Sequence, residues 1–128
     1  MARILVIEDD DSIRMLIEKF MLLDGHEVET AENGAVGLKM IGSRQYDLLI
    51  TDIVMPEQDG IGVLMELRKT SSKMKTIVIT GGTSKLQVND LMATARVMKA
   101  DKVLQKPLDF ENLSLTVAEL LKPAVEKI

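Results

Sequence analysis

Residues 4–11, with the sequence ILVIEDDD, join a run of apolar residues directly to a run of acids. A short continuous apolar run is typical of a strand that is buried on both faces of a parallel sheet. The apolar stripe of an amphipathic helix follows, at Ile13, Leu16, Ile17, Phe20 and Met21. This succession of strand, turn and helix predicts an α/β fold in which acidic side chains emerge where the first strand ends.

The alternation of strand and helix continues along the whole chain. Further strands are expected at residues 27–31, 48–50, 76–80 and 103–104, and further helices at residues 34–41, 61–70, 91–98 and 110–121. Helical connections between short apolar strands imply right-handed crossovers and a parallel sheet covered on both faces. We therefore expect one α/β domain over residues 1–122, with residues 123–128 as a C-terminal tail or the start of a linker.

Length and composition narrow the classes of function. The chain has 128 residues, a formal net charge of −4 and no cysteine. Its single histidine, His26, follows a turn and is expected to be solvated. The acidic balance argues against a nucleic-acid or anionic membrane surface, and the absence of cysteine excludes disulfides, thiol nucleophiles and Cys-ligated metals. No apolar stretch approaches the roughly 20 residues that span a bilayer. We expect a cytoplasmic protein that binds neither nucleic acid nor membrane directly.

Unusual residues stand at the ends of the expected strands. Glu8 and Asp9 follow the first strand, Asp52 the third, Thr80 the fourth and Lys106 the fifth. In open α/β sheets, ligands bind beyond the carboxyl ends of the strands. Crowded carboxylates repel one another unless a cation lies between them, and a set of oxygen ligands favours Mg²⁺. Such an ion, with an ammonium and a hydroxyl opposite it, would hold a phosphoryl group that Asp52 receives as an acyl phosphate.

The segments around these strand ends are distinctive when taken together. They are residues 4–10 (ILVIEDD), 48–56 (LLITDIVMP) with 59–60 (DG), 77–81 (IVITG) and 106–107 (KP). In this order they closely resemble the receiver domain of two-component response regulators, and the resemblance covers essentially the whole chain. It implies a flavodoxin-like, doubly wound fold in which five helices flank a five-stranded parallel sheet of order 2-1-3-4-5.

The resemblance also implies a role for each site residue. Asp52 would be the phosphoacceptor, with Thr80 and Lys106 holding the phosphoryl oxygens. Glu8, Asp9, Asp52 and the backbone carbonyl of Val54 would hold Mg²⁺, with Mn²⁺ as an alternative ion. The phosphoryl donor would be a histidine kinase or a histidine phosphotransfer protein.

The expected output follows from the length of the chain. The receiver uses essentially all of it, so we expect a single-domain regulator that switches binding to a downstream protein or passes the phosphoryl group on. It would be a monomer or a weak, phosphorylation-dependent dimer. The chain could instead be a receiver fragment of a larger regulator, since residues 122–126 (KPAVE) could lead into a linker.

The chain departs from the family pattern at several positions, two of which bear on the site and its switch. The acidic pair is Glu8-Asp9 rather than the commoner pair of aspartates, and Val103 stands where a Tyr or Phe often acts as a switch. An aromatic switch coupled to Thr80 is therefore in doubt.

Three other functions remain as alternatives. A hydrolase with an aspartyl-phosphate intermediate would need a second Asp two residues after the nucleophile, where this chain has Val54. An FMN protein would need aromatic side chains to stack on the flavin, and the chain has one Tyr, two Phe and no Trp. A degenerate receiver that binds partners without phosphate is disfavoured, because each of the five rim positions carries a suitable side chain.

Overall fold

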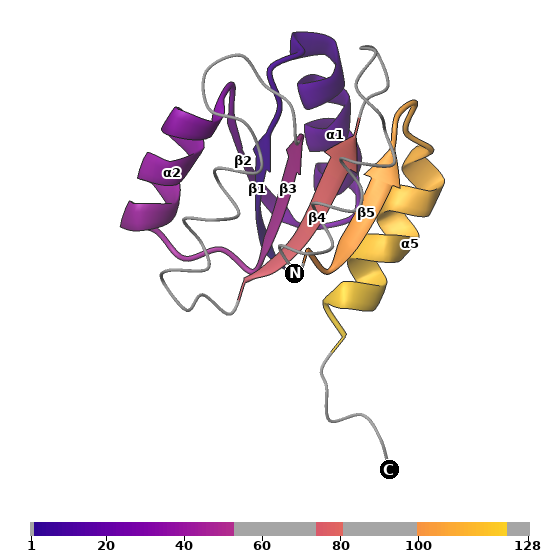
Figure 1. Ribbon diagram of the computed structural model, residues 1–128. Coiled ribbons are helices and arrows are strands. Elements are labelled where there is room, and N and C mark those ends of the chain that lie inside the picture. Colours follow the sequence, from indigo (N-terminus) through magenta and orange to yellow (C-terminus); the bar gives the residue numbers. More distant parts are fainter. Residues whose placement is uncertain (1, 53–73, 81–99, 123–128) are drawn as a thin grey trace.

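The computed structural model describes residues 2–52, 74–80 and 100–122. Its strands are β1 (Arg3–Ile7), β2 (Glu27–Ala31), β3 (Leu48–Asp52), β4 (Lys75–Thr80) and β5 (Lys102–Gln105). They form one parallel sheet of five strands in the order β2-β1-β3-β4-β5 (Figure 1). All five strands and their order are as expected, and β2, with its alternating polar residues, lies at an edge.

Helices cover both faces of this sheet (Figure 1). The described helices are α1 (Asp11–Leu23), α2 (Gly34–Ser43) and α5 (Phe110–Leu120). α1 and α5 pack on one face and α2 on the other. The helices expected over residues 61–70 and 91–98 lie outside the described residues.

Alternate residues of the central strands supply the core on each face of the sheet. Ile4 and Val6 of β1 pack with Ile17 of α1 and Leu113 of α5, whereas Leu5 and Ile7 pack on the side of α2. Successive side chains of a strand point to opposite faces, so a continuous apolar run fills both layers. The central strands are therefore buried on both faces of the sheet.

Polar side chains begin each described helix. The carboxylate of Asp10 accepts a hydrogen bond from the Ile13 amide, and the Asn33 side chain accepts one from the Val36 amide. Asp109 does the same for the first turn of α5. Such caps satisfy amides that have no partner within the helix. The expected helix starts at the acidic turn and at Asn33-Gly34 are confirmed.

Two expectations about individual side chains were wrong. Leu16 was assigned to the buried stripe of α1, but it is 44% exposed, because the helix turns Ile13, Ile17 and Met21 toward the sheet instead. His26 was expected to be solvated, yet it is half-buried and its Nδ1 accepts a hydrogen bond from the Ala2 amide at 3.2 Å. The parallel pairing of β1 with β2 brings Ala2 and His26 together.

No described helix has the length and apolar character needed to cross a membrane.

Candidate functional site

The site lies where β1 and β3 end side by side. Ile7 of β1 pairs with Thr51 of β3, so one further residue along each strand brings Glu8 beside Asp52. Both side chains continue the alternation of the buried Ile4, Val6 and Ile50, which face α1 and α5. Two residues 44 positions apart are thus placed on the same face of the sheet.

Three carboxylates meet at this point. Glu8, Asp9 and Asp52 each offer an oxygen, and these oxygens lie within 4.8 Å of one another. Glu8 is 0% exposed and Asp52 4% exposed, whereas Asp9 faces solvent. Only oxygen donors are present, and one side of the group is open to water. A hard, partly hydrated ion such as Mg²⁺ fits this donor set.

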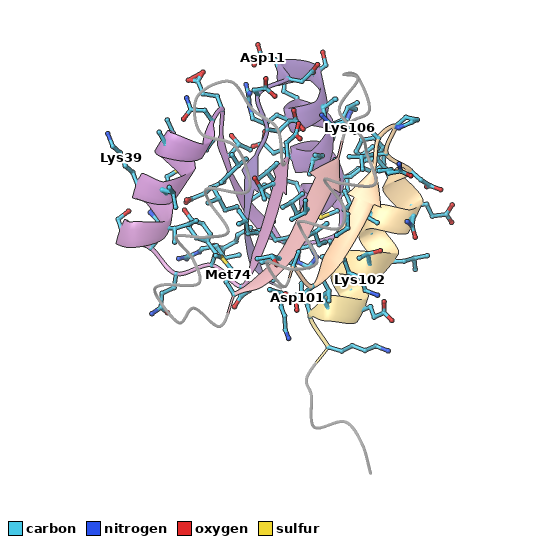
Figure 2. The ribbon with its side chains drawn as sticks, in the orientation of Figure 1. Asp11, Lys39, Met74, Asp101, Lys102 and Lys106 are labelled. Carbon is cyan, nitrogen blue, oxygen red and sulfur yellow. The ribbon has the colours of Figure 1, made fainter. Side chains whose placement is uncertain are left out.

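Lys106, which follows β5, provides the positive charge of the site. Its Nζ donates a hydrogen bond to Asp52 Oδ2 at 2.9 Å and lies 3.2 Å from Glu8 Oε1. In Figure 2, Lys106 lies at the same end of the sheet as Asp11, while Met74, Asp101 and Lys102 lie at the opposite end. The lysine that follows the fifth strand thus contacts carboxylates at the ends of the first and third strands.

The electrostatics of the site favour binding of a further cation. Burial, together with the charge of Asp52, raises the pKa of the Glu8 carboxyl to about 7, although the Asp10 amide and Lys106 act to lower it. Burial lowers the pKa of the Lys106 ammonium, but its hydrogen bond to Asp52 and the charge of Glu8 outweigh that effect and raise it. Among the described residues, Glu8 Oε1 is buried with an ion contact to Lys106 but no hydrogen bond, because the hydrogen bond from Lys106 goes to Glu8 Oε2 at 3.4 Å. One ammonium therefore does not fully satisfy two buried carboxylates.

Arg14 was not identified from the sequence, although it borders the site. Its Nη1 donates a hydrogen bond to the backbone carbonyl of Glu8 at 2.9 Å, and its Nη2 pairs with Asp11 at 2.6 Å. The spacing of Asp11 and Arg14 on one helix face could have suggested their ion pair. Nothing in the sequence pointed to the Glu8 carbonyl, because that contact depends on how the turn before α1 folds.

The remaining expected site residues are placed only in part. Thr80 ends β4, which lies between β3 and β5, but its side chain is outside the description. Val54 and the segment 81–84 after β4 also lie outside the described residues. Of the expected set, the structure brings together Glu8, Asp9, Asp52 and Lys106.

Comparison with known proteins agrees with this geometry. Residues 4–118 match the model of the response regulator receiver domain. The chain belongs to this family. The receiver is 34% identical over 121 residues to the response regulator MprA of Mycobacterium ulcerans, and the match covers 94% of this chain and 50% of MprA. The chain spans about half the length of the curated relatives it matches.

Solved structures show the same fold. The receiver domain protein of Clostridium thermocellum is 31% identical, with a TM-score of 0.85 and 94% coverage of both chains. The response regulator TrrA of Thermotoga maritima, solved with Mg²⁺ and BeF, is 36% identical with a TM-score of 0.78; 94% of this chain and 100% of TrrA are covered. This receiver is therefore a two-component signalling module whose acidic site is suited to a metal ion.

Proposed function

We propose that this receiver accepts a phosphoryl group on Asp52 in a reaction that requires Mg²⁺. The observation that carries the proposal is the junction of Asp52, Lys106 and the acidic pair at one end of the sheet. Lys106 Nζ lies 2.9 Å from Asp52 Oδ2, and the oxygens of Glu8 and Asp9 share a small volume with Asp52. A carboxylate with a metal-binding group on one side and an ammonium on the other is suited to phosphoryl transfer.

The transfer replaces one bond to phosphorus with another. An oxygen of the Asp52 carboxylate attacks the phosphorus of a phosphohistidine, an O–P bond forms, and the P–N bond breaks. The imidazole nitrogen that leaves takes up a proton from water, which gives neutral histidine. Lys106 turns from the carboxylate toward a phosphoryl oxygen, and the hydroxyl of Thr80 donates a hydrogen bond to another. A bound Mg²⁺ would supply positive charge that offsets the phosphoryl oxygens.

Glu8 and Asp9 have separate roles in this scheme. Asp9, at the open side of the group, and Asp52 would contact the ion directly, with the backbone carbonyl of Val54 as a further ligand. Glu8 is buried and already bound by the Asp10 amide at 3.0 Å, so it would act on the ion through water. Mn²⁺ has similar ligand preferences and would serve as an alternative.

The partners follow from the chemistry of the family. The donor would be a sensor histidine kinase or a histidine phosphotransfer protein in the cytoplasm, and phosphorylation would change binding to a downstream protein or allow onward transfer. We take residues 1–122 as the receiver and residues 123–128 as a tail or the start of a linker. Because the curated relatives are about twice as long, an output domain in a longer regulator is the alternative to a single-domain protein.

Incubation with acetyl phosphate and Mg²⁺ tests the proposal. We expect intact-mass spectrometry to show one added phosphoryl group in the wild type and in Asp24→Asn, an exposed control at the C-cap of α1. Asp52→Asn, or wild type with EDTA, should remain unmodified. Modification of Asp52→Asn would exclude Asp52 as the acceptor, and steady hydrolysis of a generic phosphate ester would favour the hydrolase alternative.

A further inference from the structure

Arg14 reaches from the first turns of α1 back to the end of β1. Its side chain is 18% exposed and is held by two hydrogen bonds, one to the Glu8 carbonyl and one to Asp11. The guanidinium presents a rigid fork of donors, so two fixed acceptors hold it in a single orientation.

The Glu8 carbonyl needs such a partner. Glu8 follows the last residue of β1 and is fully buried, while its own amide donates to the Ala31 carbonyl at 3.1 Å. A buried carbonyl without a partner is costly, so the hydrogen bond from Arg14 selects the orientation of the peptide that joins Glu8 to Asp9. Rotation of this peptide would move the Asp9 carboxylate relative to Asp52.

We propose that Arg14 is a positioning residue that, through the Glu8 carbonyl, aims the carboxylates of Glu8 and Asp9 at the metal site. The inference rests on the proposed function, since it assumes that these carboxylates hold Mg²⁺. Arg14 contacts neither Asp52 nor Lys106 in the hydrogen bonds described, so it acts through the backbone. Groups that orient metal ligands in this way commonly affect metal affinity by tenfold or more.

A positioning role of Arg14 and a purely electrostatic role predict opposite changes in Mg²⁺ affinity when the guanidinium is removed. A guanidinium near a cation site repels the cation, so loss of its charge alone would tighten Mg²⁺ binding. Loss of its hydrogen bond to the Glu8 carbonyl would weaken binding, because Asp9 would no longer be held in place. The direction of the change in Mg²⁺ affinity therefore separates the two effects.

The test measures Mg²⁺ binding by calorimetry in three variants. Arg14→Met keeps a long side chain but removes its donors, and we expect the Kd for Mg²⁺ to rise about tenfold. Arg14→Lys restores a charged donor and should recover most of the affinity. Arg3→Met is the matched control, because it removes one positive charge at the opposite end of β1, where Arg3 pairs with Glu27 at 3.4 Å. It should bind Mg²⁺ as the wild type does.

Phosphorylation kinetics provide a second readout. In Arg14→Met, the Mg²⁺ concentration for the half-maximal rate with acetyl phosphate should rise, while the rate at saturating Mg²⁺ changes much less. Unchanged or tighter Mg²⁺ binding in Arg14→Met would overturn the positioning role. If the wild type itself neither bound Mg²⁺ nor became phosphorylated, the proposed function would fail first, and the role of Arg14 with it.

Discussion

Glu8 shows how a single residue can be held in a high-energy environment. Its carboxyl is buried, one of its oxygens has no hydrogen bond, and Asp52 lies beside it. Burial of a charge is unfavourable unless a partner compensates it, and here Lys106 is shared between two carboxylates. This arrangement of carboxylates around one ammonium carries an electrostatic cost that a bound cation would relieve.

The raised pKa of Glu8 predicts a pH-dependent stability. The folded-state pKa is about 7 and the ordinary value is 4.5, so the folded protein binds this proton more tightly than the unfolded chain does. The contribution of this proton to the free energy of unfolding is fully present below about pH 4.5. It is lost as the pH rises to about 7, with a slope of at most about 1.4 kcal/mol per pH unit.

Urea unfolding in EDTA, from about pH 4 to pH 8, measures this contribution as the difference between wild type and Glu8→Gln. The wild type should lose stability relative to the variant across the interval and level off above about pH 7. Titrating groups that do not interact with Glu8 cancel in the difference. Parallel curves for the two proteins would contradict the raised pKa.

At the scale of elements, α2 approaches β1 through a glycine. A Cβ on Gly37 would lie 2.2 Å from Ile7 Cδ1 and 2.8 Å from Ile7 Cγ1. Gly37→Ala should therefore destabilise the protein by about 1–3 kcal/mol through overpacking. Gly42, in the same helix, has open space around it, and Gly42→Ala should stabilise by up to about 1 kcal/mol.

Chemical denaturation of Gly37→Ala and Gly42→Ala measures these changes in the free energy of unfolding. In an Ile7→Val background, which removes the methyl group nearest to the new Cβ, Gly37→Ala should cost less. Equal effects of Gly37→Ala and Gly42→Ala on the free energy of unfolding would show that the close approach of α2 to β1 does not require a glycine at position 37.

α1 and α5 are joined by the two phenylalanines of the chain. The rings of Phe20 and Phe110 stack with centroids 4.7 Å apart and an interplanar angle of 15°. A double-mutant cycle with Phe20→Leu and Phe110→Leu should give a coupling of about 0.5–1.5 kcal/mol in the free energy of unfolding. Phe20→Leu with Tyr46→Phe, on the opposite face of the sheet, should be additive; a coupling as large in that pair would argue against a specific ring contact.

At the scale of the whole molecule, the parallel sheet gathers distant residues into one site. Lys106 is 98 residues from Glu8 and 54 from Asp52, yet its ammonium is within contact of both carboxylates. Because the first, third and fifth strands each supply part of the site, a cation that binds there should stabilise the folded domain as a unit.

Mg²⁺ should accordingly protect the domain against urea. At ten times its Kd, it should add about 1.4 kcal/mol to the free energy of unfolding of the wild type and of the exposed control Asp24→Asn. Asp9→Asn should lose this gain, because it removes a charged ligand from the open side of the site. An equal gain in Asp9→Asn would show that Mg²⁺ stabilises the protein elsewhere.

The sequence by itself determined the α/β class and the position of each strand, and it singled out Glu8, Asp9, Asp52 and Lys106, which the structure brings together. Apolar runs that end in acids, in Thr80 or in Lys106 mark strand ends through local periodicity, and the joint motif indicated the family and, through it, the strand order. Local pattern also placed the start of the first helix in the acidic turn and that of the second after Asn33, because capping involves residues only a few positions apart.

Only the tertiary structure decided which of these groups touch. The raised pKa of Glu8, the reach of Lys106 to Asp52 and the hydrogen bond from Arg14 to the Glu8 carbonyl all depend on sheet register and burial. The exposure of Leu16 depends on how α1 packs on the sheet, and the partial burial of His26 depends on the pairing of β1 with β2. Periodicity identifies a face of a helix, but packing against neighbouring strands determines which side chains that face buries.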